Sequence, residues 1–224
     1  MINLSANGAS LFRWSKEYLV NVLTEGKNPI VTNPLLINAL LKIDRSDFVP
    51  EKFKDRAYDD VEIELGYNES LSKPTTIAYM LSLLNPELGK KYLDIGSGTG
   101  YSAAVLGFIA GEAGHVYTIE RVQWLWEKAR ENLSRYKDLK NIDVLYRDGI
   151  VGLPNHAPFD GIHIAFALNE IPDSLKQQLK VRGGRLVVPT DELSIRIIER
   201  TGIDTYEEEL VEGIFLGGYK AGIA

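Results

Sequence analysis

The stretch KYLDIGSGTG, residues 91–100, decides the fold of this chain. A short apolar run ends near Asp94, and Gly96, Gly98 and Gly100 then stand on alternate positions before the helical composition of YSAAVLGFIA begins. Glycines at a turn from strand to helix allow positive φ and let a ligand approach the main chain closely. The stretch therefore predicts a strand-turn-helix unit with a ligand site at the carboxyl end of the strand.

The sequence on the C-terminal side alternates short apolar runs with helical segments. We expect strands at 91–95, 115–119, 142–146, 159–167 and 184–189, and helices at 101–110, 122–136 and 172–180. Alternation at this spacing builds an α/β fold, with a mostly parallel sheet and helices on both faces. The last strand-like segments lack a helix long enough for a parallel crossover, so we expect them to be antiparallel.

The sequence before Asn85 is patterned as helices. Apolar side chains recur every three to four positions in 12–23 and in 34–43, and Pro34 stands where the first helical turn tolerates proline. The length of 224 residues fits a single domain. We divide it into an N-terminal helical, substrate-facing subdomain, a cofactor-binding core and C-terminal edge strands, at 1–86, 87–190 and 191–224.

Three acidic residues, Asp94, Glu120 and Asp148, stand at the ends of three successive expected strands. Glu120 can accept two hydrogen bonds from a ribose diol, and Asp148 can accept one from an adenine amine. An acid beside the glycine loop would repel a pyrophosphate but suits sulfonium and ammonium groups. This favours S-adenosylmethionine over a dinucleotide, although the register from Gly98 to Ala103 also fits the dinucleotide pattern G-x-G-x-x-A.

Composition excludes several kinds of site and partner. The absence of Cys excludes a disulfide framework and a thiol nucleophile. His115, His156 and His163 show no metal-ligand spacing, so we expect ordinary surface or core histidines and no metal. A net charge of −6 argues against nucleic-acid binding. Because no secretion signal and no membrane-spanning run appear, we expect a cytoplasmic monomer or small homo-oligomer, with no membrane partner.

Several longer motifs occur in the order typical of one family. They are IDRSDFVP (43–50), AYDD (57–60), GYNESLSKP (66–74), LDIGSGTGYSAA (93–104), RDGIVGLPNHAPFDGI (147–162), EIPDSLKQQLKVRGGRLVVP (170–189) and TYEEEL (205–210). On these motifs, the chain resembles the protein-L-isoaspartate (D-aspartate) O-methyltransferases. The segment SLSKP is the specific part, because a generic methyltransferase has no reason to carry it.

The resemblance implies a class I, Rossmann-like methyltransferase fold, with S-adenosylmethionine as cofactor and S-adenosylhomocysteine as product. It implies isoaspartyl or D-aspartyl residues of damaged proteins as substrate, whose methyl esters close to a succinimide and so begin repair. Ser72 matches the family's active-site serine. The positions matching its cofactor contacts are Ser70, Leu71, Asp94, Gly96, Ser97, Gly98, Glu120, Arg121, Asp148 and Gly149.

The sequence departs from the family's pattern in several places. Asn68 and Glu69 replace a usual Gly and Gln, while 166–169 and 215–218 differ from the usual A-A-A-P and F-V-P-L. These changes leave two alternatives open: a related carboxyl methyltransferase acting on a different peptide, and a non-catalytic S-adenosylmethionine-binding regulator. Ser72, just before Pro74, also suits a helix cap, and both roles can coexist.

Overall fold

The computed structural model of the protein describes residues 13–191 and 194–212. Its N-terminal part contains helices, 3₁₀-helices and one hairpin. These are α1 (Lys16–Thr24), α2 (Pro34–Lys42), η1 (Arg45–Phe48), η2 (Glu51–Arg56), the hairpin strands β1 (Ile63–Gly66) and β2 (Glu69–Leu71), and α3 (Pro74–Leu84). The helix expected over 34–43 is confirmed, and the Asn33 side chain caps it by accepting a hydrogen bond from Leu35 N.

The remaining elements alternate strand and helix before ending in two consecutive strands. They are β3 (Lys91–Ile95), α4 (Tyr101–Ala110), β4 (His115–Glu120), α5 (Gln123–Leu133), β5 (Ile142–Tyr146), η3 (Pro154–His156), β6 (Gly161–Ile164), α6 (Asp173–Lys176), β7 (Gly184–Pro189), β8 (Ser194–Arg200) and β9 (Tyr206–Glu212).

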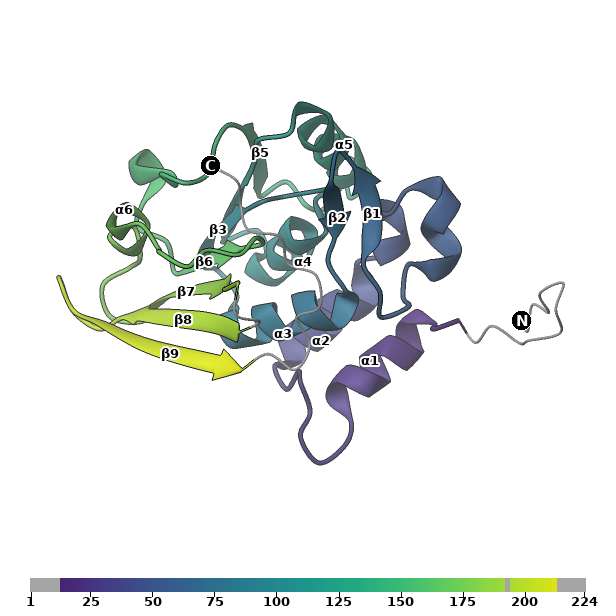
Figure 1. Ribbon diagram of the computed structural model, residues 1–224, viewed down its shortest axis with the longest axis horizontal. Coiled ribbons are helices and arrows are strands. Elements are labelled where there is room, and N and C mark those ends of the chain that lie inside the picture. The colour runs from purple at the N-terminus through teal and green to yellow at the C-terminus, as the bar shows by residue number, and fades with distance from the viewer. Residues whose placement is uncertain (1–12, 192–193, 213–224) are drawn as a thin grey trace, which may run out of the picture.

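These strands form a seven-stranded sheet in the order β5-β4-β3-β6-β7-β8-β9 (Figure 1). The pairs from β5 to β7 are parallel, whereas β8 and β9 are antiparallel to their neighbours. The chain therefore runs outward from β3 in one direction and then from β6 in the other. Open α/β sheets bind ligands beside such a reversal, at the carboxyl ends of the strands.

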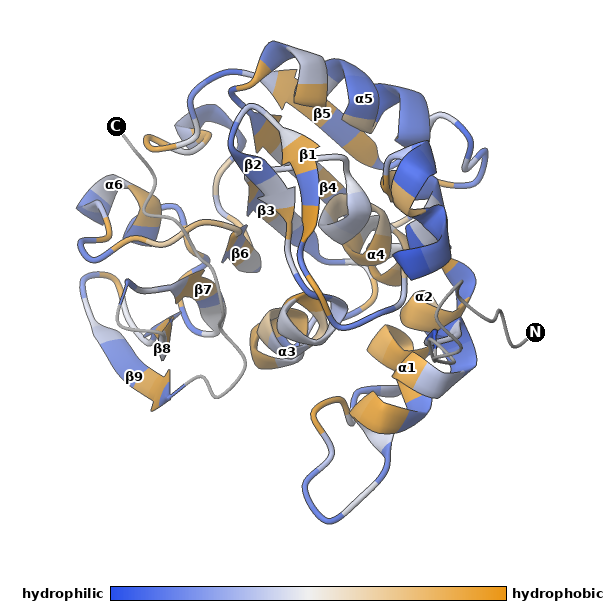
Figure 2. Cartoon of the chain, turned by 45° about the vertical axis from the view of Figure 1, so that its right-hand side comes forward, coloured by the Kyte–Doolittle hydropathy of each residue, from blue (hydrophilic) through white to orange (hydrophobic). Residues whose placement is uncertain are grey.

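The two faces of the sheet are covered differently. On one face α3, α4 and α5 pack in a cluster that includes Leu81, Leu106 and Leu125, and α2 packs outside α4. Because it is enclosed, α4 is hydrophobic along most of its length, whereas α5 shows a largely hydrophilic surface (Figure 2). The other face is covered by short segments between β5 and β7, which pack against the sheet through Phe159 and Leu175. The expected α/β architecture and antiparallel C-terminal strands are confirmed.

The helix expected over 172–180 is wrong in its length. It ends at Lys176, because Leu179 forms an isolated parallel bridge with Phe159. Phe159 N donates to Gln178 O, and Lys180 N donates to Phe159 O, both over 2.8 Å. Gln177 N still donates to Asp173 O, but Gln178 O and Lys180 N bond to Phe159, so the segment continues as a turn and a bridge instead of a helix.

The β1–β2 hairpin is an element that the helical pattern expected before Asn85 did not include. Tyr67 and Asn68 form its two-residue turn, with φ of 55° and 61°. Two successive positive φ values suit the right-handed twist of a hairpin, and Asn tolerates them better than most residues. The hairpin brings Ser70 and Leu71 to the sheet's ligand-binding edge.

Candidate functional site

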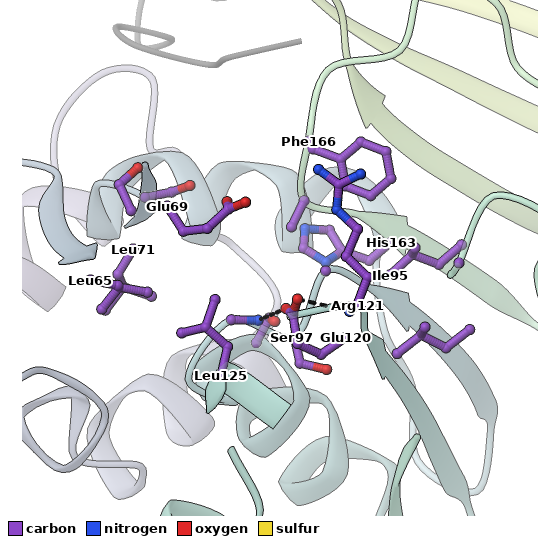
Figure 3. A pocket seen from close by; sticks show the side chains of 18 of the residues that line it. Leu65, Glu69, Leu71, Ile95, Ser97, Glu120, Arg121, Leu125, His163 and Phe166 are labelled. Atoms are coloured by element: carbon purple, nitrogen blue, oxygen red, sulfur yellow. Dashed lines mark hydrogen bonds between the residues drawn. The ribbon is translucent and has the colours of Figure 1, made fainter. Parts of the chain in front are cut away.

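A cavity of about 480 Å³ lies at the carboxyl ends of β3, β4, β5 and β6. On one side the cavity is lined by residues 67–72, in and just after the hairpin. On the other side it is lined by the ends of four strands and the residues that follow them, namely 95–98, 119–121, 147–150, and His163, Ala165, Phe166 and Leu168. Every residue that the sequence predicted for the site lines this cavity except Asp94. Figure 3 shows Glu69 and Leu71 of the hairpin facing Glu120, Arg121 and Phe166 from the sheet side.

The glycine loop forms the floor of the cavity. Gly96, Gly98 and Gly100 all have positive φ, of 93°, 54° and 98°, which explains why glycine occupies these positions. The main-chain N–H groups of Gly96 and Ser97 both donate to Ile119 O and so attach the loop to β4. The loop is held in one shape before any ligand arrives.

Glu120 ends β4 inside the cavity wall and is only 6% exposed. Its carboxylate accepts from the main-chain N–H groups of Gly98, Arg121 and Val122, each at 2.8 Å. A carboxylate has about four acceptor sites, so about one is left for a ligand hydroxyl, fewer than the two expected from sequence. Burial raises the pKa of Glu120, while the three hydrogen bonds lower it and the negative charge of Glu69 raises it further.

Asp148 and Gly149 lie just beyond β5. Asp148 is exposed, and its Oδ1 accepts from Ile150 N at 2.9 Å, which leaves Oδ2 for a ligand amine. Gly149 is buried, and a Cβ there would stand 2.2 Å from Ile95 Cγ2. Only glycine lets the main chain pass this close to the end of β3.

Asp94, which the sequence assigns to the cofactor site behind Gly96 and Gly98, does not itself line the cavity. Asp94 is fully buried and is the second-to-last residue of β3, which ends at Ile95. Its carboxylate accepts from Thr118 Oγ1 at 2.7 Å and from Ser102 Oγ at 3.1 Å, and it contacts His163 Nδ1 at 2.7 Å. The carboxylate can reach a ligand only through one of these neighbours.

His163 is a core histidine, within the expectation, but its position at the cavity was not predicted from the sequence. It is 1% exposed, it lines the cavity, and it pairs in register with Asp94 across β3 and β6. The signal for it is a histidine in a buried strand, which needs polar partners on both ring nitrogens. The sequence could not identify the partner, because nothing in it shows that β6 lies beside β3.

Ser72 lies between β2 and α3 and lines the cavity. Lys73 is the N-cap of α3 and no side chain caps this helix, so the cap alternative for Ser72 is not observed. The buried Arg45 guanidinium instead fixes the main chain here, donating to Ser72 O and to Ala57 O, both at 2.7 Å. Burial lowers the pKa of Arg45 to about 10, so it remains charged at neutral pH.

The cavity carries charges of both signs. Glu69, Glu120 and Asp148 contribute negative charge, and Arg121 and Arg147 contribute positive charge. Of the departures from the family's pattern, Asn68, Glu69, Phe166 and Leu168 line the cavity, while 215–218 lie outside the described residues. These four departures from the family's pattern therefore change the lining of the cavity itself.

Residues 13–191 and 194–212 contain neither a metal-binding cluster nor a membrane-spanning helix. No group of three or more His, Asp or Glu side chains there is arranged to hold a metal ion. No helix in the same ranges is both long and apolar enough to cross a bilayer.

Comparison with known proteins places these features in one family. The family model for protein-L-isoaspartate(D-aspartate) O-methyltransferase matches residues 15–213. A protein-L-isoaspartate O-methyltransferase of Methanosarcina mazei is 38% identical over 182 residues, covering 81% of this chain and 74% of its own. The protein-L-isoaspartate O-methyltransferase of Methanopyrus kandleri is 35% identical over 199 residues, covering 88% of this chain and 87% of its own.

Solved structures agree with the sequence relatives. A protein-L-isoaspartate O-methyltransferase superposes with a TM-score of 0.71 at 26% identity, covering 91% of this chain and 66% of its own. A Plasmodium falciparum structure, described as a beta-aspartate methyltransferase in complex with S-adenosyl-L-homocysteine, gives 0.73 at 21% identity, covering 92% and 96%. The expected methyltransferase fold is confirmed, and this chain belongs to the protein-L-isoaspartate(D-aspartate) O-methyltransferase family.

Proposed function

We propose that this protein transfers a methyl group from S-adenosylmethionine to the carboxylate of L-isoaspartyl and D-aspartyl residues in damaged proteins. The observation that carries the proposal is a single cavity lined by Ser72, which follows the hairpin, and by the glycine loop and Glu120 of the sheet. Family membership over residues 15–213 supports the same activity. The resulting methyl ester would close to a succinimide, whose hydrolysis regenerates some normal aspartate.

The residues present fit an adenosine-containing methyl donor. Glu120 retains an acceptor site for a ribose hydroxyl, Asp148 Oδ2 can accept from an amine, and positive φ at Gly96 and Gly98 lets the ligand approach the loop. S-adenosylmethionine, when bound, supplies an electrophilic methyl group on a sulfonium. We assign its binding to residues 87–190 and acceptor binding chiefly to the segment before them.

The protein's own task is positioning. An isoaspartyl α-carboxyl has a pKa of about 3.5 and is ionised at neutral pH, so no general base is needed. The Ser72 hydroxyl can donate a hydrogen bond that orients this carboxylate without protonating it. The hairpin and Phe166 line the cavity, where they would cover a bound acceptor and strengthen these interactions by displacing water.

The proposed partners are proteins, not nucleic acids, in agreement with the net charge of −6. We propose that the protein acts in the cytoplasm, because a chain without Cys suits a reducing compartment. We also propose that it is a monomer or a small homo-oligomer.

A pair of synthetic peptides tests the function. One contains an isoaspartyl residue and its twin contains aspartate at the same position. With S-adenosylmethionine present, we expect a base-labile methyl ester, measured as released methanol, on the isoaspartyl peptide only. Tight cofactor binding with no ester on either peptide would leave the non-catalytic regulator as the better account.

The cavity also supports a second candidate, a carboxyl methyltransferase acting on a different peptide. Glu69 adds negative charge and Phe166 adds bulk where the family usually has Gln and Ala. Methylation of other peptide carboxylates in preference to the isoaspartyl peptide would favour this candidate.

A further inference from the structure

Asp94 and His163 form a buried pair at the cavity, which His163 lines and Asp94 does not. Asp94 is 0% exposed and His163 is 1% exposed, and 2.7 Å separates Asp94 Oδ1 from His163 Nδ1. The other ring nitrogen, Nε2, is also buried, and no atom of the described residues forms a hydrogen bond with it. A buried polar atom without a partner is costly, so Nε2 is poised for a ligand.

The hydrogen-bond network around Asp94 fixes the tautomer of His163. The hydroxyls of Thr118 and Ser102 donate to Asp94 Oδ2, at 2.7 and 3.1 Å, so Asp94 acts as an acceptor throughout. His163 Nδ1 must then carry the proton that it donates to Oδ1. In a neutral imidazole this leaves a lone pair on Nε2, which can accept one hydrogen bond.

The strand order shows which part of the ligand meets His163. Across the sheet, Asp148 follows β5, Glu120 ends β4, the glycine loop follows β3, and His163 lies on β6. A ligand with adenine at Asp148 and ribose at Glu120 therefore directs its amino-acid end towards β3 and β6. Figure 3 shows His163 between Phe166 and the segment carrying Ser97.

We propose that His163 Nε2 accepts a hydrogen bond from the α-ammonium group of the cofactor's methionine moiety, and that Asp94 is a positioning residue acting through His163. The inference rests on the proposed function, because it assumes that cofactor. The negative charge of Asp94 favours an ammonium group nearby, although the carboxylate itself does not reach the cavity. His163 thus connects the Asp94 carboxylate to the ammonium group through a chain of two hydrogen bonds.

Three ligands and two substitutions test the proposal by calorimetry. S-adenosylhomocysteine carries both ammonium and carboxylate, its decarboxylated analogue keeps only the amine, and 5′-methylthioadenosine has neither. His163→Asn places an amide nitrogen where Nδ1 stands, so it can still pair with Asp94 while removing Nε2. The matched control is His115→Asn, because His115 forms an exposed pair with Asp143 away from the cavity.

We expect His163→Asn to weaken both amine-bearing ligands about tenfold or more, and to leave methylthioadenosine binding unchanged. His115→Asn should change none of the three. His163→Gln, whose amide oxygen can occupy the place of Nε2, should recover part of the loss. In the unsubstituted protein, the ¹⁵N resonance of His163 Nε2 should shift with the decarboxylated analogue and not with methylthioadenosine.

Failure of this inference differs from failure of the proposed function. If the unsubstituted protein binds none of the three ligands, the cofactor assignment is wrong. If it binds all three and His163→Asn weakens them equally, or weakens only the ligand with a carboxylate, the ammonium contact is wrong while the cofactor stands.

Discussion

Ser72 is the residue on which turnover is expected to depend most. Its main chain is held by Arg45, and its side chain lines the cavity without capping α3. We expect Ser72→Ala to lower kcat about a hundredfold, because one oriented hydrogen-bond donor is lost, and to change the Kd of S-adenosylhomocysteine less than about twofold. Kinetics and calorimetry on the same sample measure both. Ser134→Ala, outside the cavity, is the control, and a parallel loss of cofactor affinity in Ser72→Ala would argue against its role.

Glu69 places a negative charge where a carboxylate substrate must enter. It also contributes to the raised pKa of Glu120. We expect Glu69→Gln to lower KM for an isoaspartyl peptide about two- to fivefold, an effect that shrinks at high salt because the repulsion is screened. Glu64→Gln, on the same hairpin but outside this cavity, should leave KM unchanged. An unchanged KM in both variants would show that the substrate carboxylate binds away from Glu69.

At the scale of elements, Arg45 connects the 3₁₀ segment to the beginning of α3. Its planar guanidinium donates to Ala57 O and Ser72 O and lies over the Tyr101 ring, 5.2 Å from the centroid. A lysine cannot make this forked contact. We expect Arg45→Lys to reduce the free energy of unfolding by about 2–3 kcal/mol in urea titrations, and to lower kcat by displacing Ser72.

The control for this prediction is Arg135→Lys, because Arg135 forms exposed ion pairs with Glu131 and Asp47. Such pairs contribute about 0–1 kcal/mol, so this variant should unfold almost as the parent does. Equal stabilities of Arg45→Lys and Arg135→Lys would contradict the importance given to the buried fork.

The hairpin turn is the other element with a defined conformational demand. Asn68 has a φ of 61°, which a β-branched residue adopts only at a cost. We expect Asn68→Val to lower the free energy of unfolding by about 1–2 kcal/mol, and Asn68→Gly to be neutral or slightly stabilising. Thermal denaturation of the two variants measures the difference. If valine were tolerated as well as glycine, the turn would not have the left-handed conformation.

For the whole molecule, ligand binding should couple stability to pH through Glu120. Burial raises the pKa of this carboxyl, and its ionised form accepts from a ribose hydroxyl more strongly than its protonated form. Saturation with 5′-methylthioadenosine at about 100 times Kd should stabilise the protein by about 2.7 kcal/mol, raising Tm by roughly 5–10 °C. The gain should be full above the raised pKa and should decline as pH falls through it. In Glu120→Gln, the rise in Tm should be small and independent of pH.

The sequence alone determined the central architecture and most of the cavity wall. Glycines at 96, 98 and 100, the alternation of strands with helices, and Glu120 and Asp148 near the ends of successive strands are local patterns, and local patterns are readable without coordinates. The match to α4 and β7 is complete for the same reason, since an enclosed helix and a buried strand carry continuous apolar runs. The hairpin around Tyr67 and Asn68 was not predicted, because its strands are short and give a weak signal.

Only the tertiary structure decided the partners of the buried polar groups. Asp94 turned inward because side chains alternate along a strand, and its contact with His163 exists because β6 pairs with β3 across 69 residues of sequence. Arg45 likewise donates to the carbonyls of Ala57 and Ser72, which lie 12 and 27 residues away. Leu179 pairs with Phe159 in a bridge instead of continuing α6. These contacts depend on which segments become neighbours, and the free energy of burying and pairing them outweighs local preference.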